Sequence, residues 1–230
     1  MSPTEGVIGE AWGHYKAHWR HLLPIALIVY VAIAILGALL TLVLGWFGAL
    51  IATVISLVGL FWVQGALVTA VEDIRDGRAD LSLGDTFDRV RPQLGAIVVA
   101  GLLAGLGIVL GLVLLIVPGL ILMTWWVLVI PVVVLEKSAA GAAFSRSREL
   151  VRGYGWNVFG VIVLAILLLL GFEIVLSLVL SPLDGWLRSL VSNIVSGTLT
   201  TPFIALVWTL LYFRLRDAKS QPADPAPVTA

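Results

Sequence analysis

One uncharged stretch of the chain, Leu94 to Leu135, most constrains what this protein can fold into, because it is too long for one membrane crossing. It runs for 42 residues without an Asp, Glu, Lys or Arg, whereas about 20 apolar residues cross the hydrocarbon core of a membrane as a helix. No water is available there, so the backbone must satisfy its hydrogen bonds internally. The pair Pro118-Gly119 predicts a turn that divides the stretch into two helices, residues 94–117 and 119–135.

Four more apolar segments are long enough to cross a membrane, at residues 22–44, 50–71, 157–180 and 190–213. The composition agrees, because 60% of the residues are hydrophobic and 12% are charged, against about half and about a quarter in soluble domains. The sequence therefore predicts an all-α, polytopic transmembrane helical bundle of six spans within residues 1–216. Residues 217–230 are polar and Pro-rich, and we expect a disordered cytoplasmic tail.

The basic residues predict the orientation of the spans. All of them except Arg188 precede the first span, follow the last, or lie between spans 2 and 3 or spans 4 and 5. Because Lys and Arg stay on the cytoplasmic side, we expect a multi-pass protein of the cell (inner) membrane with both termini cytoplasmic. The formal net charge is zero and the chain has no cysteine. These features disfavour a nucleic-acid partner and exclude disulfides and Cys-ligated metals, and we predict no cofactor.

Three segments that precede odd-numbered spans share a pattern of glycine followed three residues later by an aromatic residue and then by basic residues. They begin at Gly9, Gly84 and Gly141 and reach Trp12, Phe87 and Phe144. Such a pattern is typical of an amphipathic helix that lies in the membrane interface, here called an elbow. Either an elbow followed by a helical hairpin is repeated three times, or each loop that returns to the membrane independently ends in an aromatic and basic anchor.

One formal charge, Glu173, falls within a predicted span. Asn193, Ser196 and Thr200 follow helical spacing on the last span and could face it, with Arg188 nearer the turn. The arrangement predicts either a small polar or proton-linked site or a hydrogen-bonded clasp between two helices. A single carboxylate without a second acid favours the clasp.

Basic residues between spans 4 and 5 suggest a lipid-facing segment. Arg148 and Arg152 lie one helical turn apart, with Arg146 beside them. Each basic residue near an anionic leaflet contributes about 1 kcal/mol. We therefore expect these three side chains to contact lipid headgroups.

Two other patterns favour packing over chemistry. Glu10, His14 and His18 have i, i+4, i+8 spacing, but a polar face at the membrane surface explains them, and we predict no metal site. The third span carries two pairs of glycines with three residues between the members of each. This spacing permits close helix packing, within the chain or between chains, at Gly101, Gly105, Gly107 and Gly111.

Two stretches of the chain resemble the membrane domain of glycerophosphodiester phosphodiesterases, which also occurs in stand-alone bacterial integral membrane proteins. One runs from Val117 through Trp125-Trp126 and Pro131 to Glu136, then from Ser145 to Gly153 with Trp156; the other includes Thr201-Pro202-Phe203-Ile204-Ala205 and Thr209 to Arg216. The sequence departs from the family at Phe213-Arg214, where Tyr-Asp is usual, and at Thr124, where a basic residue often stands. The resemblance implies a bundle of six or eight helices. We do not expect the phosphodiesterase activity to carry over, because we expect this protein to lack the soluble domain of the fused relatives.

The sequence contains no Gly-x-Ser-x-Gly, phosphate-binding loop or His-Glu-x-x-His motif. We therefore expect a non-catalytic membrane module that associates with lipid or another amphiphile. Its expected partners are membrane lipids, and a protein partner or a second copy stays open. A small transporter that uses the polar residues of spans 5 and 6 is the first alternative. An intramembrane lipid-processing enzyme is the least favoured one.

Overall fold

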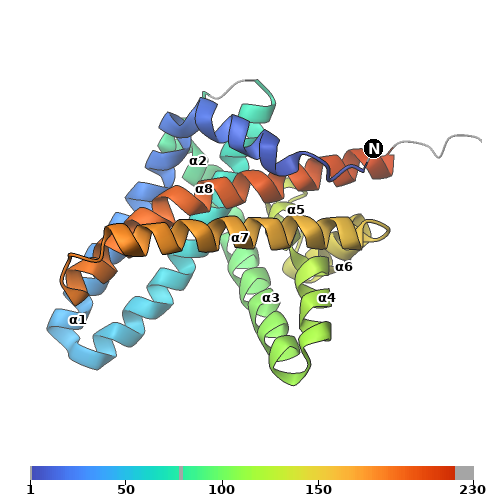
Figure 1. Ribbon diagram of the computed structural model, residues 1–230. Helices are drawn as coiled ribbons and strands as arrows, with labels where there is room; N and C mark the ends of the chain where they lie inside the picture. The colour runs from blue at the N-terminus through green and yellow to red at the C-terminus, as the bar shows by residue number, and fades with distance from the viewer. Residues whose placement is uncertain (1, 78–79, 221–230) are drawn as a thin grey trace, which may run out of the picture.

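The computed structural model describes residues 2–77 and 80–220, and over these residues the fold is all-helical, as predicted (Figure 1). Five helical stretches are long and apolar enough to cross a membrane. Their helices, with the shorter ones between them, are α1 (Val7–Arg75), α2 (Leu83–Val90), a 3-10 turn (Arg91–Gln93), α3 (Leu94–Leu114), α4 (Ile116–Trp126), α5 (Val129–Leu135), α6 (Ala140–Val151), α7 (Gly155–Val179) and α8 (Gly185–Ser220).

The 69-residue helix α1 contains two of the predicted spans. Its backbone leaves helical geometry at His18 and again at Gly45. The first break separates an N-terminal segment, elbow 1 (residues 7–17), from hairpin A (residues 19–75). Gly45 reverses the chain at the tip of hairpin A with φ 59° and ψ −134°, a conformation that suits glycine because it lacks a Cβ atom.

Hairpin B consists of α3 and α4, and its turn lies elsewhere than predicted. The chain reverses at the extended residue Leu115 (φ −154°, ψ 124°) and not at Pro118-Gly119. Pro118 fits the first turn of α4, where a missing N–H breaks no helical hydrogen bond. Gly119 instead allows the two arms of the hairpin to lie close together. It faces Gly111 on the other arm, where an added Cβ atom would lie only 2.9 Å from the Cα of Gly119. The predicted fourth span is also divided, into α4 and α5.

The glycines of α3 pack within the chain. A Cβ atom on Gly101 would meet the ring of Phe61 at 2.0 Å, and one on Gly107 would meet Trp126 at 2.4 Å. Gly105 would meet no described atom within 4 Å. Most of this glycine pattern therefore serves contacts with hairpin A and between the arms of hairpin B.

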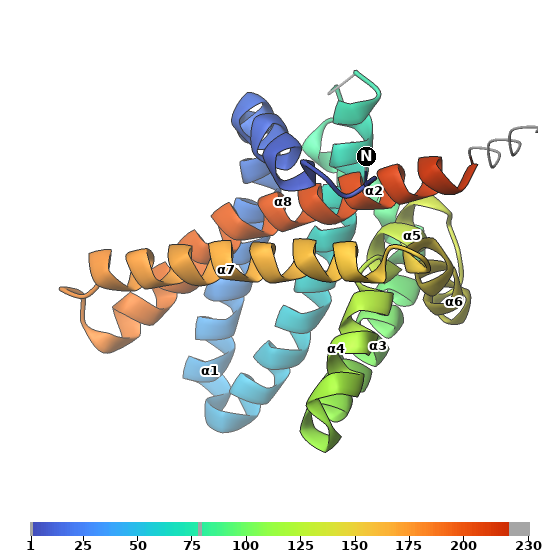
Figure 2. The same cartoon turned by 45° about the vertical axis from the view of Figure 1, so that its right-hand side comes forward.

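Hairpin C consists of α7 and α8, and α8 is longer than the sixth predicted span. It begins at Gly185 and continues to Ser220, four residues into the segment expected to be disordered. Residues 221–230, the rest of that expected tail, lie outside the described residues. In Figures 1 and 2, α7 and α8 cross hairpins A and B steeply, so the three hairpins fan out instead of running parallel.

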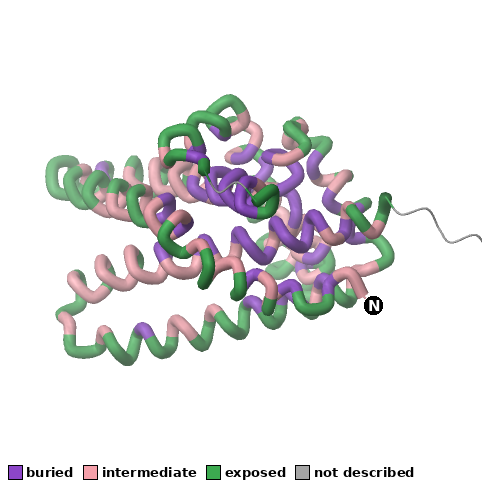
Figure 3. Tube along the Cα trace, turned by 90° about the horizontal axis from the view of Figure 1, so that it is seen from above, coloured by how far each residue is buried: buried purple, intermediate pink, exposed green. Residues whose placement is uncertain are grey.

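The core lies where the three hairpins meet, and Figure 3 shows the buried residues gathered in the middle of the molecule. There α8 packs mainly against α1. The region where the hairpins meet is here called the base of the molecule. Large side chains are fully buried in it, including Leu22, Leu67, Leu128, Leu150, Leu211 and Leu215. The hairpin arms expose apolar side chains instead, for example Leu42 (82% exposed), Val113 (77%) and Leu178 (68%). Such surfaces are unfavourable in water and suit hydrocarbon, which indicates a membrane-embedded protein.

Candidate functional site

Helix α6 is fixed against hairpin B by one buried face. Ala143, Ser147 and Leu150 follow helical spacing and are fully buried. The Ser147 hydroxyl donates a hydrogen bond to the carbonyl oxygen of Trp125, at 2.6 Å. The ring of Phe144 meets that of Trp126 edge-on, with centroids 5.0 Å apart. These contacts determine where the basic residues of α6 lie.

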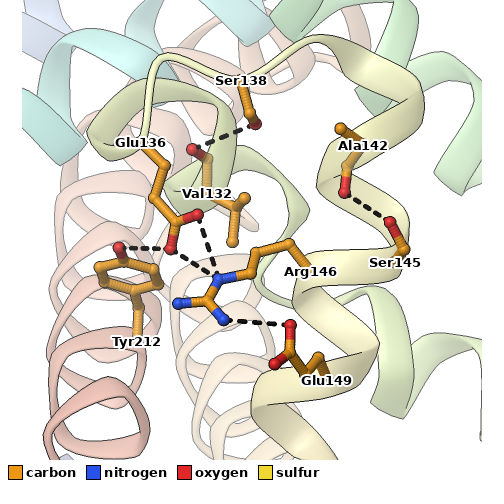
Figure 4. A network of polar contacts seen from close by, with 8 residues as sticks. All are labelled: Val132, Glu136, Ser138, Ala142, Ser145, Arg146, Glu149 and Tyr212. Atoms are coloured by element: carbon orange, nitrogen blue, oxygen red, sulfur yellow. Dashed lines mark hydrogen bonds and ion pairs between the residues drawn. The ribbon is translucent and has the colours of Figure 1, made fainter. Parts of the chain in front are cut away.

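Arg146 belongs to a network of ion pairs and hydrogen bonds at the base of the molecule (Figure 4). Its Nε donates to both carboxylate oxygens of Glu136, at 3.0 and 3.1 Å, and its Nη1 donates to Glu149 at 3.1 Å. The Tyr212 hydroxyl also donates to Glu136, at 2.9 Å. The hydrogen bond to Glu136 raises the pKa of Arg146 above its usual value. Arg146 therefore links α6 to the residue after α5 and, through Glu136, to α8.

Arg148 and Arg152 lie apart from that network, at a hollow of about 620 Å³. The Arg148 guanidinium is 4.1 Å from the centroid of the Trp125 ring, a cation–π contact. Lys219 of α8 donates to the carbonyl oxygen of Arg152 at 2.8 Å. Glu149 also lines the hollow, but its carboxylate is engaged by Arg146. The cationic side chains of Arg148, Arg152 and Lys219 are thus gathered around this hollow.

A second hollow, of about 640 Å³, lies between α4 and α7. Its lining is largely apolar and includes Leu120, Ile121 and Phe159. The two hollows adjoin, because Trp125, Gly153 and Gly155 line both of them. Together they form one groove, here called the α6 groove, which is cationic at one end and apolar at the other.

The N-terminus of α7 opens at the α6 groove. Its first residues, Gly155, Trp156 and Asn157, line the apolar hollow. Within the described part of the chain, no side chain caps this terminus. A helix N-terminus carries partial positive charge and unpaired N–H groups, and therefore favours an anion.

Glu173 and Ser196 come together between α7 and α8, as the spacing suggested. The Ser196 hydroxyl donates a hydrogen bond to the Glu173 carboxylate. The Thr200 hydroxyl donates to the carbonyl of Ser196, on its own helix, at 2.8 Å. Only Ser196 of the polar residues on α8 thus makes a hydrogen bond to the carboxylate in the described structure.

The other two residues of the predicted polar site make separate contacts. The exposed Asn193 donates to the carbonyl of Ser189, one turn earlier in α8, at 2.8 Å. Arg188 donates to the hydroxyl of Ser177 on α7, at 2.6 Å. The structure therefore shows two separate links between α7 and α8 where the sequence suggested one polar stripe.

The candidate metal residues Glu10, His14 and His18, in elbow 1 and at the break after it, take part in local contacts. Glu10 forms an ion pair with Arg214 of α8. His14 Nε2 lies 4.0 Å from Glu10, and the ring of His18 hydrogen bonds to the carbonyl of His14 at 3.2 Å. In residues 2–77 and 80–220, no three His, Cys, Asp or Glu side chains are grouped to hold a metal ion.

Sequence reasoning missed three residues that line the α6 groove, Trp125, Gly153 and Gly155, and also Lys219, which bonds to the backbone of Arg152. The Gly-Tyr-Gly run between α6 and α7 is a signal that could have indicated a break there. No family model, curated protein or solved structure matches the chain.

Proposed function

We propose that this membrane-embedded protein is a non-catalytic module that binds an anionic phospholipid in the α6 groove. The observation that carries the proposal is the continuity of the groove from a cationic hollow at Arg148 and Arg152 to an apolar hollow between α4 and α7. A phospholipid has the same division between an anionic headgroup and an apolar chain. The family resemblance stays a prediction based on the sequence motifs alone.

The contacts support a phosphate group at the cationic end. Arg148 and Arg152 line it, Lys219 is bonded beside them, and the uncapped N-terminus of α7 adds partial positive charge. The carboxylate of Glu149 is compensated by Arg146. An acyl chain then lies against Leu120 and Ile121. The volume of about 640 Å³ falls in the range of ligand pockets, about 300–1,000 Å³.

The orientation belongs to the same proposal. We infer that α2 and α6 face the cytoplasm, because they carry basic residues that stay on that side. The cytoplasmic leaflet is also the one with a negative surface potential. The α6 groove then opens where anionic phospholipids are available.

Native mass spectrometry of the purified protein with phosphatidylglycerol tests the proposal. In R148Q/R152Q the loss of two cations removes about 2 kcal/mol, which is about a 30-fold weaker Kd. The matched control is R89Q/R91Q, which neutralises two exposed arginines at and just after α2 that line none of the described hollows. A selective loss in R148Q/R152Q supports the proposal. Equal losses, or no loss, overturn it.

The transport alternative receives less support from the contacts. A substrate path between α7 and α8 would require their polar side chains to share a cavity. Asn193 instead bonds to its own helix, and Arg188 to Ser177. We therefore propose lipid binding alone.

A further inference from the structure

The three elbows share more than the glycine and aromatic pattern. The residue before each aromatic is small and fully buried, at Ala11, Thr86 and Ala143. The residue four positions after each aromatic is basic, at Lys16, Arg91 and Arg148. Each elbow therefore places one face on the protein and a cation near its far end, in the same register.

Each elbow aromatic also makes the same kind of contact with the second arm of a hairpin. The ring pairs are edge-on, with centroids 5.0 to 6.2 Å apart and interplanar angles of 77° to 81°. They are Trp12 with Phe203 of hairpin C, Phe87 with Trp62 of hairpin A, and Phe144 with Trp126 of hairpin B. Elbows 2 and 3 (α2 and α6) pack on the hairpin before them, and elbow 1 packs on the last hairpin. The three units thus close a ring.

The residue three positions after each aromatic anchors the elbow to that same arm. The Tyr15 hydroxyl donates to the carbonyl of Leu199 at 3.1 Å, as Ser147 does to Trp125. In the second unit, Val90 packs against Gly65, where an added Cβ atom would lie 2.7 Å from the Val90 side chain. The contact between an elbow and the hairpin on which it packs is here called a joint. The three joints differ in the space that they leave between elbow and hairpin.

The joint of elbow 1 contains a hollow of about 630 Å³, here called the elbow 1 groove. Elbow 1 lies over hairpin C in Figures 1 and 2. The lining is almost entirely apolar and comes from elbow 1, α7 and α8, including Trp12, Leu169, Phe172 and Phe203. This joint therefore contains a hollow between the elbow and the hairpin on which it packs, whereas the hollows near α6 lie beside Trp125 and between α4 and α7.

A cation lies at the elbow 1 groove, because Lys16 contacts the ring of Trp12, which lines the groove. Lys16 lies 5.9 Å from the centroid of the Trp12 ring, and Arg20 lies 5.4 Å from that of Trp19. At α6 the corresponding pair is Arg148 and Arg152, with Arg148 on Trp125. The elbow 1 groove thus combines an apolar lining with Lys16 at Trp12 and with Arg20 four residues further on, which complements a chain with an anionic headgroup.

We propose that the elbow 1 groove is a second binding site for an anionic phospholipid, in addition to the α6 groove. The inference rests on the proposed function, because it assigns the same ligand class to a second joint. The acyl chain lies between elbow 1 and hairpin C, and the headgroup lies at Lys16 and Arg20. In the α2 joint, the side chains of Val90 and Phe87 fill the space between the elbow and hairpin A.

A variant that fills the groove tests this site. Gly9 lines the elbow 1 groove, and a Cβ atom there would meet no described atom within 4 Å, so Gly9→Leu occupies the hollow without displacing its walls. The control is Gly13→Leu, which is also unobstructed but is not among the lining residues. Native mass spectrometry with phosphatidylglycerol reports the number of lipids retained by each folded variant.

We expect two retained lipids in the wild type and in Gly13→Leu, and one in Gly9→Leu. Neutralising Lys16 and Arg20 in K16Q/R20Q should also leave one. Equal retention in Gly9→Leu and the wild type overturns the second site. If the wild type retains one lipid that only R148Q/R152Q loses, the second site fails and the proposed function stands. If Gly9→Leu loses a lipid but R148Q/R152Q does not, the α6 site fails instead.

Discussion

The joints of α2 and α6 have the same sequence pattern but different interiors. At α2, Val90 is buried against Gly65, and the chain continues through a 3-10 turn directly into α3. At α6, the chain breaks through Gly153, whose φ of 92° is left-handed, before α7 begins. The comparison teaches that the elbow pattern determines where a helix docks. The residue three positions after the aromatic, and the turn that follows the elbow, determine whether the joint is filled or leaves a hollow.

The largest expected effect comes from overfilling the closed joint. In Gly65→Leu the new side chain must displace Val90 and Ile97, whose atoms lie 2.7 and 2.8 Å from an ideal Cβ position. Overpacking costs about 1–3 kcal/mol, so the Tm measured by circular dichroism in detergent should fall. The control Gly160→Leu, which would meet no described atom within 4 Å, should change Tm little. Equal Tm values would show that the α2 joint is not closed.

Filling the open joint should affect binding more than stability. Gly155 lines both hollows of the α6 groove, and a Cβ atom there would meet no described neighbour within 4 Å. Gly155→Leu should therefore weaken phosphatidylglycerol binding at least tenfold, about 1.4 kcal/mol, with Tm nearly unchanged. Titration by native mass spectrometry measures the affinity. An unaltered Kd would mean that no lipid occupies the α6 groove.

Removing one anchor of the α6 joint should have an intermediate effect on stability. Ser147→Ala deletes the hydrogen bond to the Trp125 carbonyl and should cost about 1 kcal/mol in unfolding free energy. Ser145→Ala is the control, since that exposed hydroxyl bonds only to Ala142 of its own helix in the described structure. Denaturation in detergent should separate the two variants. A larger loss in Ser145→Ala would contradict the docking described for α6.

The smallest change is expected in hairpin C, outside the elbow joints. Glu173→Gln keeps an oxygen that can accept the Ser196 hydrogen bond. We expect the unfolding free energy to stay within about 0.5 kcal/mol of the wild type. A sharp fall in detergent stability would indicate that the carboxylate is charged and paired.

The hydrophobic runs were sufficient to predict the helical class and the hairpins, because burying backbone in hydrocarbon leaves few alternatives. The turn of hairpin B was misplaced because proline is tolerated in a first helical turn as well as in a loop. The end of α8 was placed too early because composition alone suggested disorder beyond Asp217, whereas the helix continues to Ser220.

The candidate sites depended more on tertiary structure. Helical spacing placed Arg148 and Arg152 one turn apart, and both line the α6 groove. Arg146 does not line this groove, because its side chain is hydrogen bonded to Glu136, ten residues away in sequence. Asn193 shares a spacing with Ser196, but the way α7 crosses α8 decides which of them meets Glu173.

The most direct test of the account is a crystal structure of the protein in a lipidic phase that contains phosphatidylglycerol. The account predicts elongated density between α4 and α7, with a phosphate between Arg148 and Arg152. It predicts no lipid within the α2 joint. An empty α6 groove, or one filled by the protein's own side chains, would contradict it.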